Sequence, residues 1–172
     1  MTTDNPSKTQ LLTARIAIVL TIGLALLGVM LYGFSPEVHR RIWSDIFARP
    51  GGPMALRFAL QPVMAIVAAL HDGLKDARTG RSPYLWTMLT SRTERGGRFR
   101  EGMIATGRTI LIGLVMDTIY QAIVLKTFYP GEAVIIAILL AFVPYLLLRG
   151  PIARVARRWQ GNTATTPKET RK

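Results

Sequence analysis

Apolar residues are gathered into long runs along this chain, and most charged residues lie between the runs. The three longest runs cover 16–34, 110–125 and 133–148, and Asp117 is the charged residue inside them. About 20 apolar residues, at about 1.5 Å rise per residue, cross a hydrocarbon layer that is ~30 Å thick. The runs, with their flanks, therefore predict three transmembrane helices, at about 14–34, 105–125 and 131–148.

A fourth hydrophobic segment, at about 54–74, is harder to assign. Its uninterrupted apolar core covers only 63–70, because Gln61 and Pro62 come directly before it. Apolar stretches of roughly 10–14 residues are more often re-entrant or interfacial than spanning. The whole segment has spanning length but carries charged residues near both ends, among them Arg57. We therefore expect either an embedded helix or a fourth spanning helix.

A short helix is predicted between the first two hydrophobic segments. Ser35-Pro36-Glu37 has an N-cap serine, a proline at the first helical position and an acid in the first turn. The residues that follow place Val38, Ile42 and Ile46 on one face, as in a helix that lies in the headgroup layer. The Pro- and Gly-rich stretch 49–53 should end this helix.

Other boundaries are suggested by glycine and proline. Residues 87–108 are predicted to be a polar connector that breaks at Gly96-Gly97, and Pro144 is expected to kink the last span. Arg149-Gly150-Pro151 should end that span, with a brief amphipathic helix at 152–159.

The predicted fold is an all-α helical integral membrane protein with short interfacial helices. The 172 residues are enough for one domain. We assign a single helical membrane domain to 1–159 and a disordered cytoplasmic tail to 160–172, which is Thr-rich and has few apolar residues. Because the chain has no cysteine, disulfides and thiolate metal sites are excluded.

The chain is strongly basic, with 22 Lys and Arg and a net charge of +12. No nucleic-acid partner is expected, since no recognition fold accompanies this charge and basic residues gather in the cytoplasmic loops of membrane proteins. The basic segments are instead expected to meet anionic headgroups on the cytoplasmic side of the bilayer.

Two ways of threading the chain remain open. Four spans with the N-terminus inside leave these basic residues outside: Arg40, Arg41, Arg49, Arg57 and Lys126. Three spans with the N-terminus outside leave only Lys8, Arg15 and Lys126 outside. The positive-inside rule slightly favours three spans, whereas the length of 54–74 favours four. Both place 72–108 and the C-terminus in the cytoplasm.

Asp117 is the most informative polar residue, because an ionised carboxylate in the middle of a span costs a few kcal/mol unless it is paired. Helical spacing puts it in one column with Gly113 and Gln121, and Tyr120 is adjacent. The column indicates either a packing seam, which we favour, or a proton or cation relay. With four spans, Arg57 and Gln61 would reach the depth of this candidate intramembrane cluster, and Arg57 could pair with Asp117.

A second candidate cluster lies on the cytoplasmic side, and contains His71, Asp72, Asp76 and Arg78. Asp72 and Asp76 are i, i+4 neighbours, which could share a divalent metal. A hard cation needs more oxygens than two carboxylates supply, so we favour a solvated helix end whose acids are balanced by Lys75 and Arg78. No metal or other cofactor is expected.

The segment Asp72–Arg78 resembles the opening of the CDP-alcohol phosphatidyltransferase motif, D-G-x-x-A-R followed by G-x-x-x-D-x-x-x-D. Here three residues separate Gly73 from Ala77 instead of two, and Thr87 stands where the glycine of the second half would fall. Without the later aspartates a two-metal site cannot form. A lipid-modifying enzyme that uses Asp72 and Asp76 is kept as an alternative.

A broader resemblance covers residues 31–158, about three quarters of the chain. It rests on R-F-x-L-Q-P (57–62), D-G-x-x-D-A-R-x-G-R-x-P-Y-x-W (72–86), D-x-I-Y-Q (117–121), F-Y-P-G-E-A (128–133) and P-Y-L-L-L-R-G-P (144–151). In these features the chain resembles a family of short bacterial multi-pass inner-membrane proteins to which no activity is assigned. The resemblance implies a location in the bacterial cytoplasmic membrane.

Three functions follow in order of support. The first is a non-catalytic membrane component or accessory subunit, which packs against a second copy or a membrane partner protein. The second is a small proton- or cation-coupled transporter that uses Asp117. The third is the lipid-modifying enzyme. Polar seams are present, whereas a complete catalytic constellation is not recognisable.

Overall fold

The computed structural model describes residues 6–33, 35–48, 51 and 55–163. Nearly all of them are helical, and the prediction of an all-α fold is confirmed. The elements are α1 (Lys8–Tyr32), α2 (Pro36–Ala48), α3 (Ala55–Arg78), α4 (Tyr84–Thr90), α5 (Arg92–Tyr120), η2 (Gln121–Leu125), α6 (Pro130–Ala137), η3 (Ile138–Phe142) and α7 (Val143–Thr163). The two η elements are single π-helical turns within longer helices.

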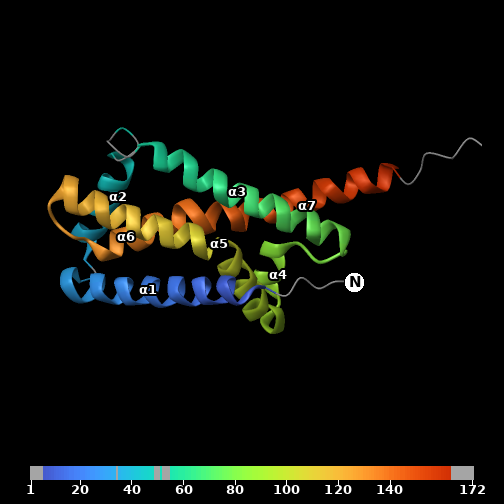
Figure 1. Cartoon of the computed structure of the whole chain (residues 1–172), viewed down its shortest axis with the longest axis horizontal. Coiled ribbons are helices and arrows are strands. Elements are labelled where there is room, and N and C mark those ends of the chain that lie inside the picture. The colour runs from blue at the N-terminus through green and yellow to red at the C-terminus, as the bar shows by residue number, and fades with distance from the viewer. Residues whose placement is uncertain (1–5, 34, 49–50, 52–54, 164–172) are drawn as a thin grey trace, which may run out of the picture.

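Within the described residues, four helices are long and apolar enough to cross a membrane: Lys8–Tyr32, Ala55–Arg78, Arg92–Leu125 and Pro130–Gln160. They lie side by side and successive ones run in opposite directions (Figure 1). The uncertain segment therefore forms one helix, α3, that runs alongside the others. This arrangement fits the prediction of a fourth spanning helix better than that of an embedded one.

The bundle has two distinct ends (Figure 1). At the basic end, α1 and α5 begin and α3 and α7 end. At the opposite end, which we term the loop end, α2 and the short turn 126–129 make the connections. Residues far apart in sequence therefore lie at the same height along the bundle. Both polar clusters are formed by contacts between such residues.

Small residues let the helices approach closely. Ala17 on α1 and Ala133 and Ala137 on α6 belong to one hydrophobic core cluster, and all three are fully buried. Large apolar side chains, by contrast, are exposed along the four long helices, for example Val19 and Val63. Small residues at helix contacts and large apolar residues outside are typical of helices packed within a membrane.

The predicted short helix is present as α2, Pro36–Ala48. Ser35 Oγ accepts a hydrogen bond from the Val38 amide at 3.3 Å, as its predicted capping role requires. Ile42 and Ile46 are buried against Ile136 on α6. Of the stretch predicted to end this helix, 49–53, all residues but Gly51 lie outside the described residues.

Two predicted boundaries are wrong. Helix α5 continues through Gly96-Gly97, so most of the predicted polar connector is helical. Helix α7 continues through Pro151 to Thr163, and the predicted helix at 152–159 is its last part, not a separate element. One proline costs a helix only one backbone hydrogen bond and some strain near the preceding turn, which packing of α7 against α3 can offset.

The expected distortion at Pro144 takes the form of the π-helical turn η3, which ends two residues before it at Phe142. Proline has no N–H to donate to the carbonyl of residue 140, and its ring crowds that carbonyl. A π turn widens the helix there and relieves the clash. Helix α7 also covers the first residues of the predicted tail, whereas 164–172 lie outside the described residues.

Candidate functional site

Most of the buried charged residues that the structure describes belong to two polar clusters, one near each end of the bundle. The Asp117 cluster, near the loop end, joins α3 and α5 and consists of Arg57, Gln61, Asp117 and Gln121. The Arg149 cluster, near the basic end, joins α3, α5, α7 and the loop after α3, and consists of Asp72, Asp76, Arg81, Tyr84, Arg98, Glu101, Tyr145 and Arg149.

Both carboxylate oxygens of Asp117 are engaged. Arg57 Nη1 lies 2.8 Å from Oδ1, and Gln121 Nε2 donates to Oδ2 at 2.6 Å. Asp117 is 0% exposed and Arg57 is 6% exposed. The ion pair that the four-span arrangement predicted is therefore present, and it lies inside the bundle.

The two glutamines extend this cluster to neighbouring backbone. Gln61 Oε1 accepts from Arg57 Nε at 2.8 Å, and Gln61 Nε2 donates to the Thr109 carbonyl at 3.2 Å. Gln121 holds both backbone polar atoms of Tyr129, at 2.5 and 3.1 Å. The cluster thus fastens α3 to α5 and also fixes the turn that leads into α6.

The predicted column on α5 is buried along its length, including Gly113, and the adjacent Tyr120 is buried as well. A Cβ at Gly113 would collide with the amide group of Gln61, so glycine is what lets α3 approach α5 here. A further buried acid, Glu132, lies in the first turn of α6. From the sequence, Glu132 was expected only to flank the apolar part of the last predicted transmembrane helix.

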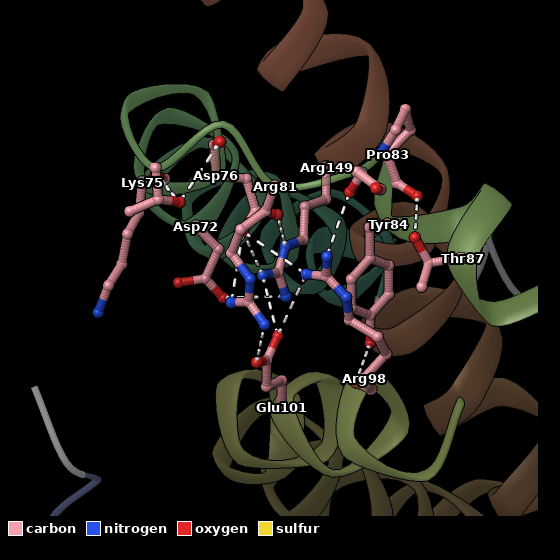
Figure 2. Close-up of polar contacts among 12 residues, drawn as sticks. Asp72, Lys75, Asp76, Arg81, Pro83, Tyr84, Thr87, Arg98, Glu101 and Arg149 are labelled. Carbon is pink, nitrogen blue, oxygen red and sulfur yellow. Dashed lines mark hydrogen bonds and ion pairs between the residues drawn. The ribbon is translucent and has the colours of Figure 1, made fainter. Parts of the chain in front are cut away.

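The Arg149 cluster is centred on one guanidinium group (Figure 2). Arg149 Nε donates to Asp76 Oδ2 at 2.7 Å, and Nη2 donates to Oδ1 at 3.0 Å. Nη1 donates to the Tyr145 hydroxyl at 2.5 Å, and Nη2 also contacts Glu101 at 3.2 Å. The Tyr145 hydroxyl in turn donates to Asp72 Oδ2 at 2.6 Å. One side chain of α7 therefore connects α3 and α5.

Two more arginines surround the same carboxylates. Arg81 Nη2 contacts Glu101 at 2.7 Å. Arg98 Nη1 lies 3.6 Å from both Asp76 and Glu101. Asp76 is 1% exposed, and a carboxylate so deeply buried is stable as an ion only with such partners.

Tyr84 closes the cluster from the side of α4. Its hydroxyl donates to the Arg98 carbonyl at 2.5 Å, and the Arg149 guanidinium carbon lies 4.3 Å from its ring centre. Burial raises the pKa of Tyr84 to about 12. The hydroxyl therefore remains a hydrogen-bond donor at any physiological pH.

Only two of the four residues predicted for the cytoplasmic cluster belong to the Arg149 cluster in the structure. Asp72 and Asp76 belong to it, whereas His71 and Arg78 are exposed. The expectation of a solvated helix end balanced by Lys75 and Arg78 is wrong for Asp76, because Arg149 is its closest partner. Arg149 comes from another helix, 73 residues away.

Sequence patterns did not identify Glu101, Arg98 and Tyr145 as members of this cluster. A signal was available, because four antiparallel spans bring the end of the 54–74 segment and the end of the last apolar run to one level. Charged residues at that level, such as Asp76 and Arg149, should then meet. Both threadings of the chain place Asp76 and Arg149 on the cytoplasmic side, so this relation holds with three spans as well as with four.

The chemistry open to each cluster is limited by its internal pairs. Within the described residues no group of three or more His, Cys, Asp or Glu is arranged to hold a metal ion. Asp117 does not line the cavity at the loop end, between α1, α2 and α6, or the cavity at the basic end. The latter, of about 550 Å³, opens beside the Arg149 cluster.

Comparison of the chain with family models, with curated proteins and with solved structures finds no match. The features of the chain that bear on its function are therefore the four apolar helices and the two polar clusters. These identify the chain as an all-α helical membrane protein.

Proposed function

We propose that this protein is a non-catalytic multi-pass component of the bacterial cytoplasmic membrane, acting as an accessory subunit that associates with a second copy or with a membrane partner protein. The observation that carries the proposal is the engagement of both Asp117 oxygens, by Arg57 and Gln121. A carboxylate held in this way joins helices, which is the role of polar groups in a packing seam.

The proposed orientation places the basic end in the cytoplasm. Of the 22 Lys and Arg, only Arg40, Arg41, Arg49, Arg57 and Lys126 belong to the loop end and its connections. The positive-inside rule then puts the basic end and the C-terminus inside. Anionic lipid on that side supplies about 1 kcal/mol for each Lys or Arg near the surface.

A transporter based on Asp117 has less support. A proton or cation relay needs a carboxylate that can exchange its ligand along a polar path. Asp117 is instead 0% exposed and lies 2.8 Å from a guanidinium nitrogen. Exchange would require this ion pair to open inside the bundle, at a cost of several kcal/mol.

A lipid-modifying enzyme based on Asp72 and Asp76 also has less support. Both oxygens of Asp76 bind Arg149, and Asp72 accepts from Tyr145. The cations that neutralise these acids are arginines, which leaves little reason for a divalent metal to bind between them.

Flux measurements on purified protein in sealed vesicles test this proposal. With a pH-sensitive dye inside and an imposed proton gradient, we expect no faster dissipation than in protein-free vesicles. An Asp117→Asn variant should behave like the parent. Flux that is lost in Asp117→Asn but retained in Glu94→Gln, an exposed acid on the same helix, would establish the relay and overturn the proposal.

Crosslinking in native membranes tests the accessory role itself. We expect a discrete adduct, whose mass identifies either a second copy of this chain or one partner of defined size. A chain that remains monomeric with crosslinkers of every length and chemistry would contradict the accessory role, even if no flux were observed.

A further inference from the structure

The cavity of about 550 Å³ lies at the basic end, between the beginning of α1, the end of α3 and α5. Gln10 lines it from α1, Asp72 and Lys75 from α3, and Ile104 from α5. Sites for small ligands are typically about 300–1,000 Å³ and combine apolar walls with a few polar groups. Both the size and the mixed lining fit such a site.

One wall of the cavity is fixed. Arg149 and Glu101 line it, and the guanidinium of Arg149 is held by Asp76, Tyr145 and Glu101. Arg81, also in the lining, is held by Glu101 at 2.7 Å. These charges neutralise one another, and a ligand would meet them as a preorganised polar wall.

Two charged groups of the lining retain binding capacity. Lys75 makes no ion pair with any residue that the structure describes, and its side chain extends away from the arginines (Figure 2). Asp72 uses Oδ2 for Tyr145, whereas its other oxygen points away from the arginines in the same view (Figure 2). The cavity thus offers one ammonium group and one carboxylate oxygen.

These two groups lie close together. Asp72 and Lys75 are three residues apart on α3, and residues at this spacing have Cβ atoms about 5–6 Å apart on one helix face. A ligand that bears a negative and a positive group a short distance apart would therefore satisfy both. A purely anionic ligand would meet Lys75 favourably but would face the Asp72 carboxylate.

The depth of the cavity indicates the ligand's origin. The apolar part of α3 ends at Leu70, and the apolar run before Arg149 ends at Leu148. Ile104 and Ala105 line the cavity near the start of the apolar part of α5. The lining thus crosses the boundary between apolar and charged residues, which is the level of lipid headgroups.

We propose that this cavity binds the headgroup of a phospholipid that carries a phosphodiester and a primary ammonium, with Lys75 contacting the phosphate and Asp72 accepting from the ammonium. Ile104 and Ala105 would contact the glycerol and the first carbons of the acyl chains. The inference goes beyond the proposed accessory role and requires only that the four helices span a bilayer.

Native mass spectrometry of the purified full chain, titrated with single lipids, tests the inference. Phosphatidylethanolamine should bind at least about fivefold more tightly than phosphatidylglycerol or phosphatidylcholine, because only its headgroup supplies both the phosphate and a hydrogen-bonding ammonium. Lys75→Gln and Asp72→Asn should each weaken that binding about tenfold, the loss expected for one charge-assisted hydrogen bond.

Arg78→Gln is the matched control, since Arg78 is an exposed cation on the same helix outside the cavity. It should leave the affinity unchanged. Asp72→Asn keeps an oxygen acceptor for Tyr145, and unchanged thermal midpoints for the three variants would show that they fold normally. Excess inorganic phosphate should not displace the lipid, because it lacks the ammonium and the apolar part.

Three results would overturn the inference. Equal affinity for the three lipids would remove headgroup recognition. An unaffected Lys75→Gln variant would place the lipid elsewhere. Displacement by inorganic phosphate would make the cavity a site for a free anion. None of these results bears on the flux and crosslinking tests, so failure of one proposal is distinguishable from failure of the other.

Discussion

Arg57 and Asp117 are ionisable side chains inside the apolar part of the bundle. Their 2.8 Å contact, the hydrogen bond that Arg57 donates to Gln61 and the one that Asp117 accepts from Gln121 offset the cost of removing both charges from water. Removing one partner leaves the other as an unpaired buried charge, whereas replacing both with apolar residues leaves no charge to compensate. Substitution of one partner should therefore lower the free energy of unfolding more than substitution of both.

We expect Asp117→Asn to lower the free energy of unfolding by about 3 kcal/mol, because the charge facing Arg57 is lost. The double variant Arg57→Leu/Asp117→Leu should lose less than Asp117→Asn alone. Thermal unfolding in one detergent measures both, with Glu94→Gln as the control. A double variant that is less stable than Asp117→Asn would show that the pair is not the stabilising unit.

Arg149 depends on geometry as well as on charge. It binds Asp76 through two nitrogens and also reaches Tyr145 and Glu101. Lysine keeps the charge but cannot form the two-pronged contact. We expect Arg149→Lys to lower the free energy of unfolding by about 2–3 kcal/mol.

Arg154→Lys provides the comparison, because Arg154 is exposed on the same helix. Its effect on the thermal midpoint should be close to zero. Equal stability of Arg149→Lys and the parent would mean that charge alone holds the Arg149 cluster together.

At the scale of elements, the contact of α1 with α6 depends on a glycine. A Cβ at Gly28 would lie 2.6 Å from the Gly131 nitrogen and 2.8 Å from its Cα. Backbone atoms cannot move aside as a flexible side chain can, so α1 would have to shift outward. The two helices approach at Gly28 more closely than any larger residue allows.

Gly28→Ala should therefore lower the free energy of unfolding by about 1–3 kcal/mol through overpacking. Gly23→Ala on the same helix meets nothing within 4 Å and should be neutral or stabilising by up to about 1 kcal/mol. Comparison of the thermal midpoints of the two variants tests whether Gly28→Ala is the less stable one. A Gly28→Ala variant as stable as Gly23→Ala would contradict this close contact.

The elements could be predicted where the local signal was strong. The apolar runs and the Ser35-Pro36-Glu37 start gave correct helices. The errors at Gly96-Gly97 and Pro151 have one cause, since glycine and proline were assumed to end helices. Two glycines cost roughly 2 kcal/mol, and the 29-residue helix α5, capped by Ser91, outweighs that cost.

The candidate sites could be predicted only as far as the topology was known. The column on α5 followed from helical spacing, and the pair of Arg57 with Asp117 followed once four spans were assumed. The link from Arg149 to Asp76 did not follow, because local spacing says nothing about a contact between helices 73 residues apart. The cavity depends on several helices at once and has no signal in any one segment.

At the scale of the whole molecule, charge is distributed unevenly along the bundle. The basic end collects most of the Lys and Arg, and the loop end holds few. With all four helices spanning the membrane, as we propose, α2 and the loop after α3 would lie on opposite sides of it. The proposed orientation, the depth of both clusters and the headgroup site all depend on it.

Cysteine labelling tests this arrangement most directly, because the chain has no native cysteine. Ser44 on α2 and Ser82 after α3 are both exposed, so each can be replaced by cysteine singly and treated with a membrane-impermeant maleimide in intact bacterial cells. We predict that Ser44→Cys is labelled in intact cells and that Ser82→Cys is labelled only after the cells are broken. Protection of both positions until breakage would place them on one side and contradict the four-span arrangement.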